Sequence, residues 1–427
     1  MNNNQIQADS ARRVLFVDMN SFFASCEQQE NYWLRGRPVA VCVYTGKFGC
    51  IISPSVEAKR HGIKTGMRLN DAVKLCPELI PLETKPQRYR EFHNKIIKVL
   101  KRYSENVIPK SIDEAIVDIS DYALIYKDPV VLAKTIKQDI KTDVGDWLKC
   151  SIGIAPNAFL AKLGSNIQKP DGLTCIFPEN IDEVLKKLSL RDLPGIARGM
   201  SDRLAKGGIS TPLELRYARP DIIKTACKSV VGLYWHMRLN FSEVDMISHD
   251  YKSMQAMRHL SRDQRQSTTY MVDLMQALCM KLEKRMVQQE VFCQEISVFL
   301  RFENGHSWSE HVKNGRPLQD GMEVYKIICE RMKKFENINS IKSLLNESVI
   351  SLGVTVYSFI SDELIQYNMF EDNVRKDRLR KVVYDIKNRF GTDKVMKAAE
   401  LHDETILEDV IGFGSIKDIH DDLHKIA

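Results

Sequence analysis

The pattern of apolar and polar residues predicts the same order of strands and helices twice along the chain. In the N-terminal half, apolar runs typical of buried strands alternate with stretches in which apolar residues recur at helical spacing. The strands are expected at residues 14–18, 105–109, 114–119 and 150–155, and the helices at 88–103 and 129–148. Leaving aside residues 22–86, this order is β-α-β-β-α-β.

A second β-α-β-β-α-β pattern begins near residue 252. Its strands are expected at residues 254–260, 292–302, 307–313 and 349–359, and its helices at 268–287 and 319–335. The order of elements repeats, but we detect no internal sequence repeat. The sequence therefore predicts a mixed α/β (α+β) protein with more than one domain.

The first pattern brings three acidic residues together. In a split β-α-β unit the third strand lies between the first two, so the end of the first strand adjoins the hairpin between the others. Asp18 ends the first strand, and Asp113 and Glu114 stand in "SIDEA" at that hairpin. Adjacent strand residues point to opposite faces, so both reach the site only if the chain bends, and Pro109 favours a bend there.

Two further segments lie outside these patterns. Residues 22–86 contain helical signals at 55–60 and 70–76 and are expected to form a small inserted lobe. A mainly helical stretch up to about residue 245 contains "LPGIARGMSDRLAKGGIST", at 193–211. This segment is typical of a helix-hairpin-helix, in which glycines such as Gly195 and Gly208 let a DNA phosphate approach backbone N–H groups. An ordinary turn between two helices fits the spacing equally well.

Composition sets the broad class of the protein. A chain of 427 residues with 44% hydrophobic and 28% charged residues is typical of a globular protein of several domains. No apolar run approaches the roughly 18 residues that a membrane helix needs, and the polar N-terminus lacks a signal-peptide core. We therefore expect a cytoplasmic protein. The ten cysteines are scattered without zinc-type spacing, which favours reduced, buried thiols.

The net charge of +6 is distributed unevenly. Residues 401–427 contain seven acidic and two basic residues, so the rest of the chain has a charge of +11. A basic body with an acidic end favours a polyanionic partner for the body, although a charge excess of this size also occurs on ordinary solvated surfaces.

Three carboxylates at one sheet edge indicate a metal site. Mg²⁺ is usually bound by one or two carboxylates together with phosphates and water, and two such ions can serve phosphoryl transfer. In the alternative interpretation, Asp18 caps a helix and Glu114 pairs with a lysine. Next to this edge, one of Phe22 and Phe23 could pack in the lobe core, while the other lies beneath a nucleotide sugar and excludes a 2′-hydroxyl. Lys59 and Lys169 are candidate triphosphate ligands.

The motifs together resemble the Y-family of translesion DNA polymerases. "FVDMNSFFASCE", "SIDEA", "GIAPNAFLAKLGSNIQKPDG" and "LPGIARGMSDRLAKGGIST" occur in the order found in that family, and the resemblance covers residues 12–400. It implies a right-hand polymerase with the following domains: palm at 1–22 and 86–174, fingers at 23–85, thumb at 175–245, little finger at 252–360, and a tail at 361–427.

The resemblance also implies roles for individual residues. Asp18, Asp113 and Glu114 would bind two Mg²⁺ ions, with the Met19 carbonyl as an added ligand. The other roles concern the nucleotide: Phe23 falls on the steric-gate position with Phe22 beside it, Ser53 and Lys59 lie near the triphosphate, and Lys169 lies on the phosphates. The expected partners are primer–template DNA and a dNTP.

The fingers motif departs from one branch of this family. Many members have Tyr-Glu-Ala-Arg where this chain has Val56-Glu57-Ala58-Lys59, and lysine does not replace the bidentate fork of arginine. The sequence around Asn20 and the "EAK" motif are more similar to the UmuC branch than to the DinB (polymerase IV) branch. This similarity makes a UmuD-like subunit a possible partner.

A peptide near the C-terminus suggests another partner. "QYNMF", at 366–370, resembles the sliding-clamp-binding peptide of bacterial replication proteins. Met369 and Phe370 would enter an apolar pocket and Gln366 would form a hydrogen bond, unless the segment packs on its own domain. Two other functions remain open: a catalytically silent scaffold of a mutagenesis complex, and a nucleotidyl cyclase, whose palm has similar topology. The presence of all three acids disfavours the scaffold. The helix-hairpin-helix and the second β-α-β-β-α-β unit disfavour the cyclase, because a cyclase does not need to follow a duplex.

Overall fold

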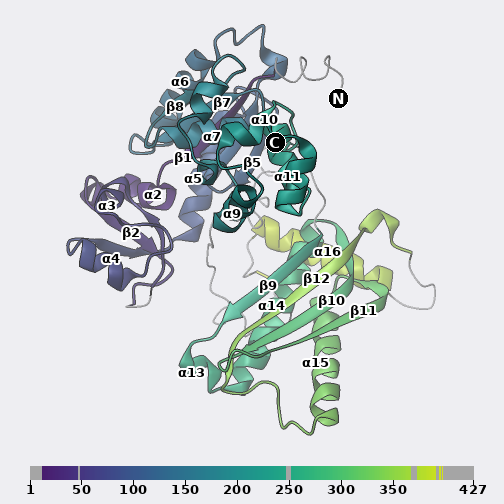
Figure 1. Cartoon of the computed structure of the whole chain (residues 1–427). Coiled ribbons are helices and arrows are strands. Elements are labelled where there is room, and N and C mark those ends of the chain that lie inside the picture. The colour runs from purple at the N-terminus through teal and green to yellow at the C-terminus, as the bar shows by residue number, and fades with distance from the viewer. Residues whose placement is uncertain are drawn as a thin grey trace. The chain divides into compact units, whose positions relative to one another are not determined.

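The computed structural model describes residues 12–46, 49–246, 252–366 and 373–390, together with 394, 395 and 397. The chain divides into two compact units, one mainly of residues up to 248 and the other from 249 to 409, and each is described by itself (Figure 1). Among the described helices, none is long and apolar enough to cross a membrane.

The first unit is built around a five-stranded sheet with the strand order β5-β6-β1-β7-β8. The strands are β1 (Val14–Met19), β5 (Val107–Ser111), β6 (Glu114–Asp118), β7 (Cys150–Ala155) and β8 (Leu173–Cys175). β6 lies between β1 and β5 and is antiparallel to both, which confirms the predicted split topology. β8, parallel to β7, was not predicted, because a three-residue strand has too little pattern to read.

Helices cover both faces of this sheet, because successive side chains along a strand point to opposite faces and the apolar ones on each face are buried. Leu15 and Val17 belong to an apolar cluster with α5 (Pro86–Leu100) and α6 (Pro129–Asp139). Val14 and Phe16 point the other way, into a cluster with α7 (Ala158–Ile167). The central strand is therefore buried on both faces, as its continuous apolar run predicts.

The inserted segment forms a small lobe with its own sheet. The predicted helices are present as α3 (Val56–Arg60) and α4 (Leu69–Leu75), and α2 (Phe22–Glu30) leads into the lobe. The three-stranded sheet β3-β2-β4 was not predicted; its strands are β2 (Val39–Cys42), β3 (Ile51–Pro54) and β4 (Ile80–Glu83). A separate apolar cluster lies between this sheet and the two helices.

The rest of the first unit is helical, as expected. Its longer helices are α9 (Arg198–Lys206), α10 (Pro212–Tyr217), α11 (Pro220–Cys227) and α12 (Val231–Leu239). Gly195 and Gly208 stand before and after α9 with φ of +85° and +82°, a region that favours glycine over residues with a side chain. The glycines of the predicted helix-hairpin-helix are therefore required by the backbone.

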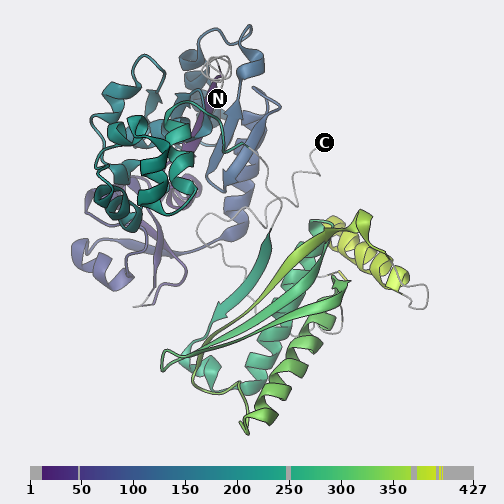
Figure 2. The same ribbon diagram turned by 45° about the vertical axis from the view of Figure 1, so that its right-hand side comes forward.

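The second unit is a four-stranded sheet with the order β11-β10-β12-β9, and α14 and α15 cover one of its faces (Figure 2). All six elements match the predicted order: β9 (Ser253–His259), α14 (Thr268–Gln288), β10 (Val291–Phe302), β11 (Ser307–Leu318), α15 (Gly321–Ile338) and β12 (Val349–Ser361). All neighbouring strands are antiparallel.

A further helix, α16 (Asn373–Phe390), packs against α14 within this unit. Arg380 is buried and its guanidinium contacts Asp377 at 2.7 Å and Asp320 at 3.1 Å. Part of the segment interpreted as a tail is thus attached to the second unit. The domain boundaries themselves stay predictions.

A close contact between α7 and β7 yields a stability prediction. A Cβ at Gly153 would stand 1.9 Å from the carbonyl oxygen of Ala161, so Gly153→Ala forces the helix away from the strand. We expect a loss of about 1–3 kcal/mol in the free energy of unfolding, typical of overpacking, in urea denaturation. Gly199→Ala is the control, since no atom of the described residues lies within 4 Å of a Cβ there. Equal stability of the two variants would contradict the packing described here.

Candidate active site

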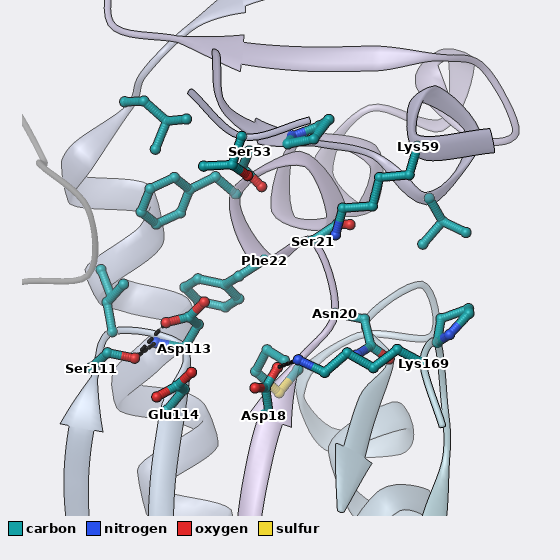
Figure 3. A pocket seen from close by; sticks show the side chains of 18 of the residues that line it. Asp18, Asn20, Ser21, Phe22, Ser53, Lys59, Ser111, Asp113, Glu114 and Lys169 are labelled. Carbon is teal, nitrogen blue, oxygen red and sulfur yellow. Dashed lines mark hydrogen bonds and ion pairs between the residues drawn. The ribbon is translucent and has the colours of Figure 1, made fainter. Parts of the chain in front are cut away.

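The predicted convergence of the three acidic residues is observed. Asp18 is the register partner of Glu114 in the β1–β6 ladder, and Asp113 lies in the turn just before β6. The Met19 N–H donates to the carbonyl of Asp113 at 2.9 Å, which fixes the turn beside the end of β1. The three side chains point into one cleft (Figure 3).

The bend that this convergence requires lies at the β5–β6 hairpin. The register of the two strands shifts between Pro109 and Ser111. The Ser111 hydroxyl donates to Asp113 Oδ1 at 2.5 Å, so the turn holds the Asp113 carboxylate in place. Because Asp113 stands in the turn, it escapes the strand alternation that would otherwise point it away from Glu114.

Two lysines neutralise this edge of the sheet. Lys162 Nζ lies 2.6 Å from Asp18 Oδ2 and also contacts Glu114 Oε1. Lys169 Nζ lies 2.8 Å from Asp18 Oδ1 (Figure 3). Lys169 was a candidate from the sequence, whereas the position of Lys162 was not anticipated. No local pattern marks Lys162; only its place on the helix after β7, the strand that pairs with β1, relates it to this edge.

Burial changes the acid–base behaviour of these groups. Burial raises the pKa of Asp113 above its ordinary value, and the charge of Asp18 adds to this effect. Burial likewise raises the pKa of Glu114, against the opposing charge of Lys162. Burial disfavours the charge on Lys162, but Asp18 and Glu114 outweigh it and raise its pKa. Burial in the cleft therefore disfavours the charged carboxylates, and neighbouring cations and a hydrogen bond partly offset that cost.

Asn20 connects the end of β1 to the loop that carries Lys169. Its side-chain amide donates to the Ser151 hydroxyl at 3.1 Å, and its Oδ1 accepts from the N–H of Asp171 at 2.7 Å. Because Asp171 is two residues from Lys169, this bridge places the lysine beside Asp18. The next residue, Ser21, has φ of 49°, and its buried hydroxyl has no hydrogen-bond partner among the described residues.

The inserted lobe supplies the opposite side of the cleft. The side chain of Ser53 reaches the cleft from β3, and the side chain of Lys59 reaches it from α3 (Figure 3). α3 is fixed at its start by Ser55, whose hydroxyl accepts from the Ala58 N–H at 3.2 Å. Burial lowers the pKa of Lys59, and the positive charge of Lys169 lowers it further.

The two phenylalanines form an aromatic part of the cleft wall. Phe22 and Phe23 both line the cleft and are almost completely buried. The ring of Phe23 stacks on Tyr89 with centroids 4.4 Å apart. Tyr89 in turn donates its hydroxyl to the buried Glu27 at 3.0 Å, so the ring that supports Phe23 is itself held.

The cleft has a volume of about 730 Å³ and gathers most of the predicted site residues. These are Asp18, Met19, Phe22, Phe23, Ser53, Lys59, Asp113, Glu114 and Lys169. Gly195 and Gly208 do not line it. Of the clamp-like peptide, Gln366 is exposed, while Met369 and Phe370 lie outside the described residues.

The donor set fits divalent cations. Carboxylate oxygens are the ligands that Mg²⁺ prefers, and lysine ammonium groups already stand against two of the three side chains. The oxygens of all three do not lie within 4.8 Å of one another among the described residues.

Comparison with known proteins identifies the family. A model described as the impB/mucB/samB family matches residues 17–166, and the model of that family's C-terminal domain matches residues 251–369. Together the two matches span more than half of the chain.

Individual relatives support the same family assignment. A DNA polymerase IV of Alkaliphilus oremlandii is 28% identical over 414 residues, covering 90% of this chain and 98% of the relative. A DNA polymerase IV of Shewanella sp. strain MR-7 is 34% identical over 213 residues, covering 50% of this chain and 59% of the relative. These names do not support the expected closeness to the UmuC branch and point instead to polymerase IV.

Solved structures show the same fold. A Y-family DNA polymerase chimera of Dbh and Dpo4 superposes with a TM-score of 0.66 at 24% identity, over 82% of this chain and 99% of that one. Dbh DNA polymerase in an insertion ternary complex gives a TM-score of 0.55 at 23% identity, with the same coverage. The right-hand architecture expected from the sequence is thereby confirmed. The chain belongs to the impB/mucB/samB family, the Y-family of translesion DNA polymerases.

Proposed function

We propose that this Y-family DNA polymerase joins a dNTP to a primer 3′-hydroxyl in the cleft at the end of β1. Asp18, Asp113 and Glu114 would hold two Mg²⁺ ions, with the Met19 carbonyl as a further ligand. The observation that carries this proposal is the convergence of three buried or half-buried carboxylates in one cleft, where Lys162 and Lys169 pair with two of them. When bound, such a pair of ions activates the attacking hydroxyl and stabilises the leaving phosphate.

The lysines have a separate role in this proposal. Lys59 and Lys169 line the same cleft, and the charge of Lys169 lowers the pKa of Lys59. A triphosphate between them would relieve this repulsion and form charge-assisted hydrogen bonds. Ser53 would add a hydroxyl donor. Lys162 would compensate Asp18 and Glu114 while the enzyme is free of substrate.

Phe23 would act as the steric gate. Its ring is fixed by stacking on Tyr89, so it cannot easily yield to a larger sugar. A rigid ring beneath the sugar would leave no room for a 2′-hydroxyl, and discrimination would arise from the clash rather than from a hydrogen bond. Phe22 would complete the wall beside it.

Three contacts with macromolecules extend the proposal. Gly195 and Gly208, which have no side chain, would let the phosphates of primer–template DNA approach backbone N–H groups near them, and no described residue fills the space beside Gly208. The peptide of Gln366, Met369 and Phe370 would bind a sliding clamp, which would raise the effective concentration at the primer end. A UmuD-like subunit stays a prediction from the sequence. The silent-scaffold alternative requires loss of the acids, and all three are present.

The metal assignment predicts the effect of Asp113→Asn on catalysis. We expect primer extension on undamaged and abasic templates to fall by at least about 10²–10³-fold, the loss typical for one group that stabilises a transition state. Binding of primer–template DNA should persist in a mobility-shift assay. Asp71→Asn, at an exposed acid of the inserted lobe, is the control and should extend primers normally. Full activity of Asp113→Asn would refute the assignment.

The raised pKa of Asp113 predicts that Asp113→Asn, which should impair catalysis, makes the folded protein more stable. The native carboxyl holds its proton more tightly than the unfolded one, so the charged form costs stability as pH rises above the ordinary carboxyl range. In EDTA at pH 7, Asp113→Asn should therefore raise the free energy of unfolding by roughly 0.5–2 kcal/mol. The gain should shrink as pH falls below the native pKa and disappear below the ordinary carboxyl pKa. A variant that melts below wild type at pH 7, with Asp71→Asn unchanged, would contradict this.

The steric-gate assignment predicts a change in sugar selectivity. Phe23→Ala removes the ring that faces the 2′ position, so incorporation of NTP relative to dNTP should rise at least about tenfold, the factor that corresponds to 1.4 kcal/mol. Single-nucleotide insertion kinetics with matched dNTP and NTP measure this ratio. Phe22→Ala is the paired variant and should change the ratio much less. If the larger change belongs to Phe22→Ala, the roles of the two rings are reversed.

A further inference from the structure

A second group of metal-ligand side chains lies in the inserted lobe. His61, Cys76 and Glu78 each offer one ligand atom, and these atoms all lie within 4.8 Å of one another. The distance from His61 Nε2 to Glu78 Oε1 is 3.9 Å. None of the three residues lines the cleft of the carboxylates. No other group of three or more such donors meets this distance limit among the described residues.

We propose that His61, Cys76 and Glu78 bind one transition-metal ion of the zinc class. A thiolate, an imidazole and a carboxylate are the three donor types that Zn²⁺ takes in proteins, with water as the usual fourth ligand. Tetrahedral bonds of about 2.0–2.3 Å place neighbouring ligand atoms roughly 3.3–3.6 Å apart. The separation of His61 Nε2 from Glu78 Oε1 therefore needs to shorten by roughly 0.3–0.6 Å, and the other two by no more than about 1.5 Å. The side chains of His61 and Glu78 are 44% and 70% exposed, so they are free to rotate that far.

The backbone around the group is fixed by local structure. His61 is the residue that ends α3, and its N–H donates to the carbonyl of Ala58 at 3.1 Å. Cys76 ends α4 in the same way, with its N–H on the carbonyl of Ala72 at 2.9 Å. Glu78 follows across Pro77, whose ring restricts the chain. The three ligands thus come from two helix ends that the lobe core already holds together.

The alternative is an inert core cysteine beside a surface ion pair. Cys76 is buried in the lobe core, which is the common environment of a free cysteine. Two features favour the metal site. The thiol forms no disulfide in the described part of the chain, and two exposed donors with a preference for the same metals stand beside it.

A bound ion would connect the lobe to the cleft. Lys59 is two residues before His61 on α3, and it reaches the cleft from that helix. A bond from His61 to the end of α4 would hold α3 from its second end, opposite the Ser55 cap. The proposal is independent of the function assigned to the carboxylates, because the two sites share no ligand.

Cobalt binding tests the proposal on the full chain. Purified protein is freed of metal with EDTA, dialysed and titrated with Co²⁺, while the thiolate-to-cobalt charge-transfer absorption is followed. Wild type should gain this absorption with one equivalent of Co²⁺, and Zn²⁺ should abolish it. Ions bound only by the carboxylates of the cleft give no thiolate absorption, so failure here would leave the polymerase assignment unaffected.

Variants assign the ligands. Cys76→Ser should lose the absorption, whereas Cys50→Ser, at another cysteine of the same lobe, should keep it. His61→Ala and Glu78→Gln change exposed side chains that the fold does not require, and each should weaken Co²⁺ binding by about 10–100-fold. Absence of the absorption in wild type, its persistence in Cys76→Ser, or unchanged affinity in both exposed variants would overturn the proposal.

Discussion

The site depends on the antiparallel pairing of β1 with β6, which sets the buried Asp18 opposite Glu114. Removing carboxylates from water costs several kcal/mol per ion unless cations and hydrogen bonds compensate it. Lys162 and Lys169 supply that compensation, and Ser111 supplies a hydrogen bond to Asp113. The pairing therefore creates a concentrated demand for positive charge, and the remainder of the first unit is arranged around it.

Other elements serve this edge by close contact. α7 approaches β7 where Gly153 has no side chain, and this approach brings Lys162 to the carboxylates. Asn20 ties the loop of Lys169 to the same strand end. The inserted lobe contributes Lys59 from across the cleft, at a point where burial and the charge of Lys169 lower its pKa. An arrangement of cations around desolvated acids is suited to the binding of metal ions and a triphosphate.

The fold around the acidic edge could largely be predicted from the sequence, because apolar residues recur clearly at strand and helix spacing. The order of elements in both β-α-β-β-α-β patterns, and the meeting of Asp18 with Asp113 and Glu114, followed from apolar periodicity and topology alone. The three strands of the inserted lobe were missed because they have only four residues each. Lys162 was missed because a lysine on a helix has no local signal; only the packing of α7 on the sheet brings it to the acids. The prediction of the UmuC branch was wrong because it relied on a few short motifs, whereas the similarity along the whole chain is to DNA polymerase IV proteins.

The most direct test of the central claim is a crystal structure with primer–template DNA, a dNTP and Mn²⁺, using a primer that lacks its 3′-hydroxyl. Anomalous scattering locates Mn²⁺ without assumptions about the ligands. We expect two anomalous peaks bounded by Asp18, Asp113 and Glu114, with Lys162 Nζ withdrawn from at least one of its two carboxylates. A well-ordered ternary complex without such peaks, or with Lys162 still on both carboxylates, would contradict the central claim.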